Sequence, residues 1–405
     1  MNPTSLDSTS GRAPLRIGIA GFGSAGRSFL PAVRSHPGYE LAAIAEPAEA
    51  IRQELARDLQ VAAYVSLAEM LVHPGLDVVY VATPTVLHTE HVLLAMGAGK
   101  HVLVEKPMAV NVEHAMAMVR AADSAGVVFV VGHSHGYDLP IQRMREIIAG
   151  GSLGPVRMVN SWCYTDWMDR PRRPDEVDTA LGGGVTYRQG AHQFDVIRLL
   201  CGGMVRSVRA KTFDWNPDRR GMGAHVVFMD FEDGAAATAV YNGYGRFSSV
   251  DLCFNITESG FNQPPEYTPR TQGVPVGLST QHVQRAKQER AKKANWAKAP
   301  HQPFFGLTVV SCERGDIRQS PQGLWIYSDA GKTEITLPTD RSPRDLVLDE
   351  LHDAIVGKTQ ALHDARWGLA NLEVCDAAIV SSSSGRDVLL SHQVPIRTRR
   401  NVIPM

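Results

Sequence analysis

The sequence has few cysteines, almost no net charge and no long apolar run. Its 405 residues include five scattered cysteines, which argues against a disulfide framework or a zinc site. A formal net charge of −1 gives no general attraction to nucleic acid or to an anionic membrane. No apolar run is long enough to span a bilayer, and residues 1–13 lack the apolar core of a signal peptide. We therefore expect a cytoplasmic protein with a flexible arm over residues 1–13, no nucleic-acid partner and no membrane partner.

Two patterns divide the rest of the chain. With 44% hydrophobic residues the sequence can fill two domain cores. Over residues 14–135, short apolar runs alternate with helical segments, which predicts an α/β Rossmann domain with a parallel sheet. The strand candidates are 15–20, Tyr39–Ala45, Val78–Ala82, His101–Val104 and Val127–Val131.

Residues 136–405 show longer alternating runs, which predict an α+β domain with a large, mostly antiparallel sheet. We expect this domain to bind the substrate and to form the subunit contacts. The strand candidates are Val156–Tyr164, Val205–Phe213, His225–Phe231, Ala235–Tyr241 and Ser249–Thr257. Hairpin turns are expected at Glu232–Gly234 and Asp329–Gly331, and helices at Gln189–Leu200 and twice between Arg344 and Ser381.

Residues 260–303 match neither pattern and are interpreted as an insertion. Within it, Gln281–Lys298 is polar, basic and predicted to be helical. A solvated loop, a flap over a substrate pocket and a subunit contact are all open interpretations, because long loops in compact domains are usually functional or disordered.

A glycine-rich loop lies between the first strand and the first helix. Backbone N–H groups at such a turn can hold the pyrophosphate of a dinucleotide. The loop residues predicted to bind the cofactor are Gly21, Phe22, Gly23, Ser24, Ala25 and Gly26. Glu46 follows Gly26 by twenty residues and would accept hydrogen bonds from the adenosine ribose, which favours NAD over NADP. The alternative is that Glu46 only caps the helix that begins near Pro47.

Three further motifs follow this loop in order: Ala82-Thr83-Pro84 with His88, Glu105-Lys106-Pro107, and Gly182-Gly183-Gly184 with Gly190 and His192. With them the chain resembles the glucose–fructose oxidoreductase and inositol dehydrogenase family of NAD(P)-dependent enzymes. The resemblance implies that Lys106 lies beside the nicotinamide and the reacting carbon, and that His192 donates or accepts a proton. It also implies a cofactor pocket, often with a cis peptide before the proline, lined by Thr83, Pro84, His88, Glu105, Lys106 and Pro107.

Arg188 is the largest departure from the family, which usually has an aspartate four residues before its histidine. On a helix Arg188 and His192 would share one face, so the guanidinium would keep His192 neutral and could bind a substrate carboxylate. The alternative is that Arg188 forms a structural ion pair. The preceding segment suits a ring-shaped anion, although a solvated loop is an equal alternative, and its candidate residues are Tyr164, Trp167, Arg170, Arg172 and Arg173.

At the crossover between the domains, Gly136 stands where many relatives have an arginine. His133 and His135 precede it at alternate positions. We expect His135 to line the substrate pocket, and we expect no metal ion, since no third ligand has a suitable spacing.

These details resemble the branch that includes phthalate 4,5-cis-dihydrodiol dehydrogenases. That resemblance implies an anionic small-molecule substrate, a cyclohexadiene cis-diol with two carboxylates, which NAD oxidises to 4,5-dihydroxyphthalate during aromatic catabolism. The alternatives are an NAD-dependent inositol, sugar or sugar-acid dehydrogenase, an NAD-assisted glycosidase, and a non-catalytic nucleotide sensor. An exposed face of the antiparallel sheet would provide the contact for a homodimer or homotetramer.

Overall fold

A computed structural model of the chain describes residues 13–217, 220–263, 282–283, 285–287, 289, 298–357 and 359–397. The predicted arm, apart from its last residue, and most of the insertion 260–303 lie outside these ranges. Within the predicted helix 281–298, the described positions 282–283, 285–287 and 289 are helical.

The first sheet has six parallel strands in the order β3-β2-β1-β4-β5-β6. The strands are β1 (Leu15–Ala20), β2 (Tyr39–Ala45), β3 (Ala62–Tyr64), β4 (Val78–Val81), β5 (His101–Glu105) and β6 (Phe129–Gly132). The connecting helices are α1 (Ser24–Ser35), α2 (Glu49–Leu59), α3 (Leu67–Met70), η1 (Thr85–Leu87), α4 (His88–Gly97) and α5 (Val112–Ala125). The predicted Rossmann fold is confirmed. Because the strand order reverses at β1 and β4, a crevice for a ligand is expected where the carboxyl ends of these strands meet.

The second sheet has nine strands in the order β14-β13-β12-β11-β7-β10-β9-β8-β15. Only β7 and β10 pair in parallel, so the predicted, mostly antiparallel sheet is confirmed. Both predicted hairpin turns are present, between β9 and β10 and between β13 and β14. The strands are β7 (Val156–Tyr164), β8 (Val205–Phe213), β9 (Ala224–Phe231), β10 (Ala236–Asn242), β11 (Leu307–Cys312), β12 (Gly315–Ser320), β13 (Gly323–Ser328), β14 (Gly331–Thr336) and β15 (Val388–Leu389).

The strand predicted at Ser249–Thr257 is wrong. Its first part forms the 3-10 helix η6 (Ser249–Cys253), which Ser248 caps by accepting a hydrogen bond from the Val250 N–H at 3.4 Å. Ser249, Cys253 and Ile256 are the buried side chains, and this spacing of three to four residues is helical rather than alternating.

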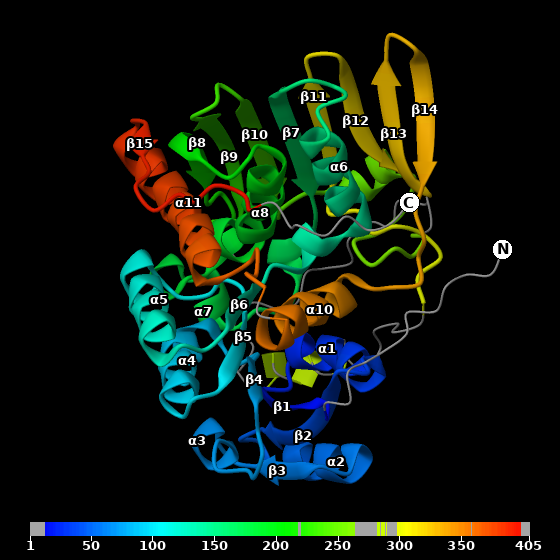
Figure 1. The fold of residues 1–405 in the computed structure, drawn as a ribbon. Coiled ribbons are helices and arrows are strands. Elements are labelled where there is room, and N and C mark those ends of the chain that lie inside the picture. Colours follow the sequence, from blue (N-terminus) through cyan, green and yellow to red (C-terminus); the bar gives the residue numbers. More distant parts are fainter. Residues whose placement is uncertain are drawn as a thin grey trace, which may run out of the picture.

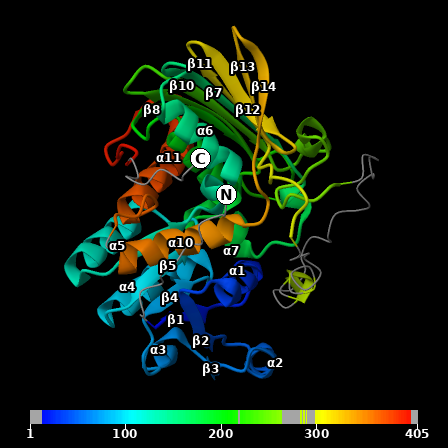
Figure 2. The same ribbon diagram turned by 45° about the vertical axis from the view of Figure 1, so that its right-hand side comes forward.

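Helices fill the space between the two sheets (Figures 1 and 2). The predicted helix 189–200 is present as α8 (Ala191–Leu200), in which every residue is buried. The two predicted C-terminal helices are α10 (Pro343–Val356) and α11 (Ala365–Ser384). The remaining elements are η2 (Ser134–Tyr137), α6 (Leu139–Ala149), η3 (Trp167–Asp169), α7 (Pro174–Val177), η4 (Thr179–Leu181) and the π-turn η5 (Thr186–Gly190).

The hydrophobic core runs without a break from one sheet to the other. One buried cluster contains Val102 of β5, Phe194 of α8 and Val227 of β9. A second cluster joins Val347 and Leu351 of α10 to the first sheet and α1. The C-terminal part of the chain therefore packs against the Rossmann sheet and holds η2 and α8 close to its crevice.

One face of the second sheet carries exposed apolar side chains. Met158 and Trp162 of β7 are 47% and 40% exposed, and Val226 and Phe228 of β9 are 46% and 45% exposed. The strand registers place all four on the same face, on either side of β10. Among the described helices, none is long and apolar enough to cross a membrane.

Candidate active site

The predicted cofactor residues meet at one edge of the first sheet. Gly21 follows β1, Glu46 follows β2, Thr83 follows β4 and Lys106 follows β5, each within two residues of the strand's carboxyl end. His133 comes directly after β6. Since parallel strands end at the same edge, residues far apart in the sequence line a single crevice.

The glycine-rich loop has the geometry that a pyrophosphate needs. Gly21 has a φ of 91°, and a Cβ there would lie 2.8 Å from the Ala82 carbonyl oxygen. A Cβ on Gly26 would collide with the Gly21 carbonyl oxygen, whereas one on Gly23 would meet no heavy atom within 4 Å. Helix α1 begins at Ser24, and Gly23 provides no side-chain cap for its first N–H groups. The loop is therefore closely packed on the protein side and open on the side where a phosphate would bind.

Glu46 holds this loop through its carboxylate. Oε2 accepts a hydrogen bond from the Phe22 N–H at 3.2 Å, and Oε1 accepts one from the Ala48 N–H at 3.0 Å. Ala48 is the N-cap of α2, so the capping role is present in the structure. A carboxylate accepts about four hydrogen bonds, so these two contacts leave capacity for the ribose hydroxyls. The ribose role stays a prediction.

Replacing Glu46 with Gln tests that role. We expect the KM for NAD to rise about tenfold, because a hydrogen bond to a charged group contributes about 1.5–3 kcal/mol. The KM for NADP should fall, since the charge that repels the 2′-phosphate is gone. Initial rates with each cofactor measure both changes, and an unaltered ratio of NAD to NADP preference would show that Glu46 only supports the loop.

His88 connects two turns beneath the crevice. Its Nε2 lies 2.9 Å from the Thr83 carbonyl oxygen, and its Nδ1 lies 2.9 Å from the Pro107 carbonyl oxygen. The residue is 1% exposed, and burial is the main reason why its pKa falls to about 4. His88 therefore fixes the positions of Thr83, Pro84 and Pro107 from below, which differs from the predicted place on the wall of the cofactor pocket. The Lys106–Pro107 peptide bond is cis.

Lys106 is half-buried where the first sheet meets the second part of the chain. Its Nζ donates a hydrogen bond to the Arg188 carbonyl oxygen at 2.9 Å. Burial, together with the positive charge of Arg188, lowers the pKa of Lys106 to about 8, against the opposing effect of Glu105. Glu105 itself accepts a hydrogen bond from the Tyr80 hydroxyl at 2.6 Å. Lys106 is thus an ammonium at neutral pH that can lose its proton at moderate cost.

His192 lies at the start of α8 and is 6% exposed. Its Nδ1 is buried and has no hydrogen-bond partner among the described residues. Burial lowers the pKa of His192 well below its usual range, and the charges of Lys106 and His135 are the next largest causes. His192 is therefore neutral, as predicted, but burial, Lys106 and His135 are the main causes, and Arg188 is not among the largest.

Arg188 lies in the π-turn η5 and reaches toward the Rossmann domain. Its Nη1 donates to Thr85 Oγ1 at 2.6 Å, and its Nη2 lies 3.6 Å from Glu176 Oε1. The ion pair that was the alternative interpretation is thus present. The backbone of Arg188 holds Lys106 at the same time, so one residue connects Lys106 to Thr85 and Glu176.

The arginine-rich segment is mostly paired internally. Arg170 Nε donates to Asp166 at 2.8 Å, and Arg173 makes two hydrogen bonds of 2.8 Å to Asp175. These two guanidinium groups already bind carboxylates, which weakens their predicted role in holding a substrate.

The guanidinium carbon of Arg172 lies 3.9 Å from the centroid of the Trp167 ring. Trp167 is 2% exposed, so it supports Arg172 and does not face a ligand as predicted. The ring of Tyr164 packs edge-on against Phe247 at 5.6 Å.

Sequence reasoning missed Glu176 and Lys287. Glu176 is 2% exposed, and Lys287 Nζ of the insertion donates to its Oε1. Although burial opposes ionisation, Lys287, Arg188, Arg173 and Arg172 lower the pKa of Glu176 to about 2. Two cations, Lys287 and Arg188, therefore contact this one carboxylate, and no local sequence signal connects positions 176, 188 and 287.

Sequence reasoning also missed Asp138 and Phe305, which hold His135. Asp138 Oδ2 accepts a hydrogen bond from His135 Nδ1 at 3.0 Å, and Phe305 stacks on the His135 ring at a centroid distance of 4.3 Å. The His135 ring packs edge-on against the His192 ring, with 4.7 Å between the ring centroids. The His135/Asp138 spacing of three residues was the available signal. No three His, Cys, Asp or Glu side chains in the described ranges form a group that could hold a metal ion.

The fold and this crevice define a two-domain, NAD-binding oxidoreductase. Residues 15–133 match the model of an oxidoreductase family with an NAD-binding Rossmann fold, and residues 141–257 match the GFO/IDH/MocA C-terminal domain. The chain therefore belongs to the glucose–fructose oxidoreductase, inositol dehydrogenase and MocA family, as the resemblance indicated.

Similarity to individual proteins agrees with this family. The chain is 34% identical over 378 residues to 1-carboxy-3-chloro-3,4-dihydroxycyclohexa-1,5-diene dehydrogenase of Comamonas testosteroni, covering 90% of this chain and 94% of that protein. A crystal structure from Bordetella bronchiseptica RB50, classed as a dehydrogenase, is 37% identical with a TM-score of 0.86, covering 93% of this chain and 100% of the other. An Agrobacterium radiobacter oxidoreductase, solved with NAD+, L-tartaric acid and magnesium, has a TM-score of 0.70 over 93% of this chain and 98% of that one; at 18% identity it shows the shared fold alone.

Proposed function

We propose that the protein uses NAD to oxidise a carboxylated cyclohexadiene cis-diol, with phthalate 4,5-cis-dihydrodiol as the substrate and 4,5-dihydroxyphthalate as the product. The observation that carries this proposal is that Lys287 and Arg188 share the single carboxylate of Glu176, while the backbone of the same Arg188 contacts Lys106. A group of side chains with more positive than negative charges favours an anionic ligand. The similarity to the Comamonas testosteroni enzyme supports it, because that enzyme is named for a cyclohexadiene diol with a carboxyl group.

The chain's own residues supply binding and charge stabilisation. NAD, when bound, accepts a hydride from the carbinol carbon. The Lys106 ammonium has three N–H bonds, one of which is taken by the Arg188 carbonyl oxygen, and the others can donate to the substrate oxygen as negative charge develops on it. Arg188 and Arg172 would hold a carboxylate so that the carbinol faces Lys106, and the ketone product then enolises to the aromatic diol.

Replacing Arg188 with Met tests the carboxylate contact. We expect the KM for the dicarboxylated dihydrodiol to rise about 30-fold, because a charge-assisted pair contributes roughly 2 kcal/mol. The KM for benzene cis-dihydrodiol, which has no carboxylate, should change little. The matched control is Arg170→Met, because Arg170 is already bonded to Asp166. Equal losses on both diols would mean that the Arg188 side chain supports the site through Thr85 and Glu176 and does not contact the carboxylate.

An NAD-dependent dehydrogenase of an inositol, sugar or sugar acid is the second candidate. The observation that favours it is that Arg188 already contacts Thr85 and Glu176, so a neutral polyol would not leave its guanidinium unpaired. Reduced-nicotinamide absorbance with a panel of dihydrodiols, myo-inositol and glucose separates the two. Turnover restricted to the polyols would exclude the dihydrodiol proposal.

The subunit contact and the cellular location belong to the same proposal. The exposed apolar face formed by Met158, Trp162, Val226 and Phe228 favours a homodimer or homotetramer. Sedimentation velocity would detect either, and a monomer at micromolar concentration would contradict it. A cytoplasmic location is supported by the five cysteines, which are all free thiols.

A further inference from the structure

His135 and Asp138 form a buried carboxylate–imidazole pair beside His192. Element η2 directs His135 Nδ1 to Asp138 Oδ2 at 3.0 Å. Asp138 is 2% exposed, and its burial raises the pKa of its carboxyl. The His135 side chain keeps 14% of its surface exposed. A carboxylate on Nδ1–H fixes the tautomer of an imidazole, directs Nε2 away from the carboxylate and stabilises the cation formed when Nε2 accepts a proton.

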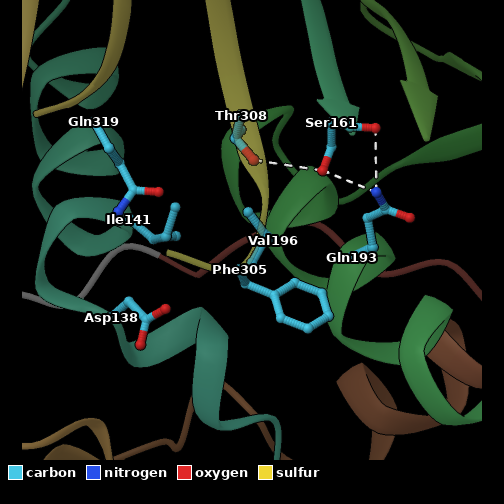
Figure 3. A pocket seen from close by; sticks show the side chains of 8 residues that line it. All are labelled: Asp138, Ile141, Ser161, Gln193, Val196, Phe305, Thr308 and Gln319. Carbon is cyan, nitrogen blue, oxygen red and sulfur yellow. Dashed lines mark hydrogen bonds between the residues drawn. The ribbon is translucent and has the colours of Figure 1, made fainter. Parts of the chain in front are cut away.

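Asp138 also borders a small cavity (Figure 3). Asp138 Oδ1 is buried and has no hydrogen-bond partner among the described residues. The cavity has a volume of about 10 Å³ for a water-sized sphere, which is about the minimum for one water molecule. Its polar lining includes Ser161, Gln193, Thr308 and Gln319.

His192 has the opposite surroundings. Its Nδ1 has no partner among the described residues, and the cationic or titratable groups Lys106, His135, His133 and Arg344 all disfavour a charge on its ring. Protonating His192 would place a buried imidazolium next to the Lys106 ammonium without a carboxylate to stabilise it. His192 is therefore suited to contact the substrate as a neutral imidazole and poorly suited to take up a proton.

We propose that His135, supported by Asp138, is the base that removes the substrate's hydroxyl proton. The rings of His135 and His192 pack edge-on with 4.7 Å between their centroids, so His135 lies directly beside His192. In this step the O–H bond breaks and the proton goes to His135 Nε2. The carbon–oxygen double bond forms as the hydride leaves the same carbon for NAD, so charge and electrons balance. His135 then releases the proton to solvent.

Imidazole rescue distinguishes the two histidines. We expect His135→Ala to lower kcat about 100-fold, the range of a lost general base, and added imidazole to restore most of that loss in a saturable manner. His192→Ala should also lose activity, but without rescue. Asp138→Asn preserves the shape of the side chain, should lower kcat in the same direction and should not respond to imidazole, because its imidazole is still present. Rescue of His192→Ala instead of His135→Ala would overturn the inference, as would full activity of Asp138→Asn.

The inference rests on the proposed function, so each variant is compared with the wild-type protein on the alcohol of the panel that the wild type oxidises fastest. Absence of dihydrodiol turnover by the wild type contradicts the proposed function and leaves the rescue test intact on a polyol. Thermal midpoints and NAD affinity equal to those of the wild type identify variants whose fold is preserved. A His135→Ala variant that is folded, inactive and not restored by imidazole counts against the proposal.

Discussion

Lys106→Met is expected to lower kcat about 1000-fold while the affinity for NAD stays close to that of the wild type. The ammonium is the group placed to stabilise the oxyanion, and removing one such donor costs up to about 10³ in rate. Methionine keeps the length of the side chain and removes the charge. NAD should still bind, because the glycine-rich loop and Glu46 lie at the ends of other strands. Steady-state rates and calorimetric titration with NAD measure the two quantities.

The pH dependence of kcat/KM tests the same role of Lys106. The Lys106 ammonium is the working form, and its pKa is lowered to about 8 by burial and Arg188, so kcat/KM should fall as the pH rises through about 8. Lys106→Met should lose this alkaline limb. Lys332→Met is the control, because Lys332 lies over Trp325 in the second sheet and should leave both rate and profile unchanged. A rate that rises through pH 8 in the wild type would instead make Lys106 the base.

Local sequence patterns predicted the crevice because each of its residues lies next to a strand that can be recognised from the sequence. Gly21, Glu46 and Lys106 each follow a strand directly, and a parallel sheet places the ends of its strands together whatever lies between them. Both sheets could be predicted for the same reason. A strand buried on both faces is a continuous apolar run, and a strand buried on one face alternates apolar and polar residues. The strand expected at Ser249 failed because a short run of apolar residues fits either period.

Contacts between distant segments could not be predicted. Arg188 was recognised as unusual, but its partner Glu176 and the further cation Lys287 lie in other segments, and only the folded chain brings them together. The spacing of His135 and Asp138 was readable, whereas the stacking of Phe305 on His135 joins residues 170 positions apart.

Gly136 is a third such case. A Cβ at this position would collide with Asp195 Oδ2 and lie 2.9 Å from His363 Nε2, so the structure requires glycine there. Neither residue is near Gly136 in the sequence. The crossover between the domains thus packs against a buried charged group, Asp195 with His363, that no local sequence motif predicts.

That group ties α8, η2 and the segment after α10 together. Asp195 Oδ2 lies 3.4 Å from His363 Nε2, and His363 Nδ1 lies 3.5 Å from Glu350 Oε1. Asp195 Oδ1 also accepts a hydrogen bond from Trp367 Nε1 at 2.7 Å. Burial alone would lower the pKa of His363, but Asp195 and Glu350 raise it to about 9, so the imidazole is a cation at neutral pH.

Asp195→Asn should therefore lower the free energy of unfolding by roughly 3 kcal/mol at pH 6, because removing one partner of a buried pair leaves an uncompensated charge. Since the pKa of His363 is raised from 6.5 to about 9, its stabilising contribution is complete below about pH 6.5 and is lost as the pH rises through about 9. The difference between variant and wild type should accordingly be much smaller at pH 9.5, measured by urea denaturation. Asp123→Asn breaks only the exposed pair with Arg366 and should cost less than about 1 kcal/mol. An equal loss for Asp195→Asn at both pH values would show that its hydrogen bond to Trp367, and not the charge of His363, holds the crossover together.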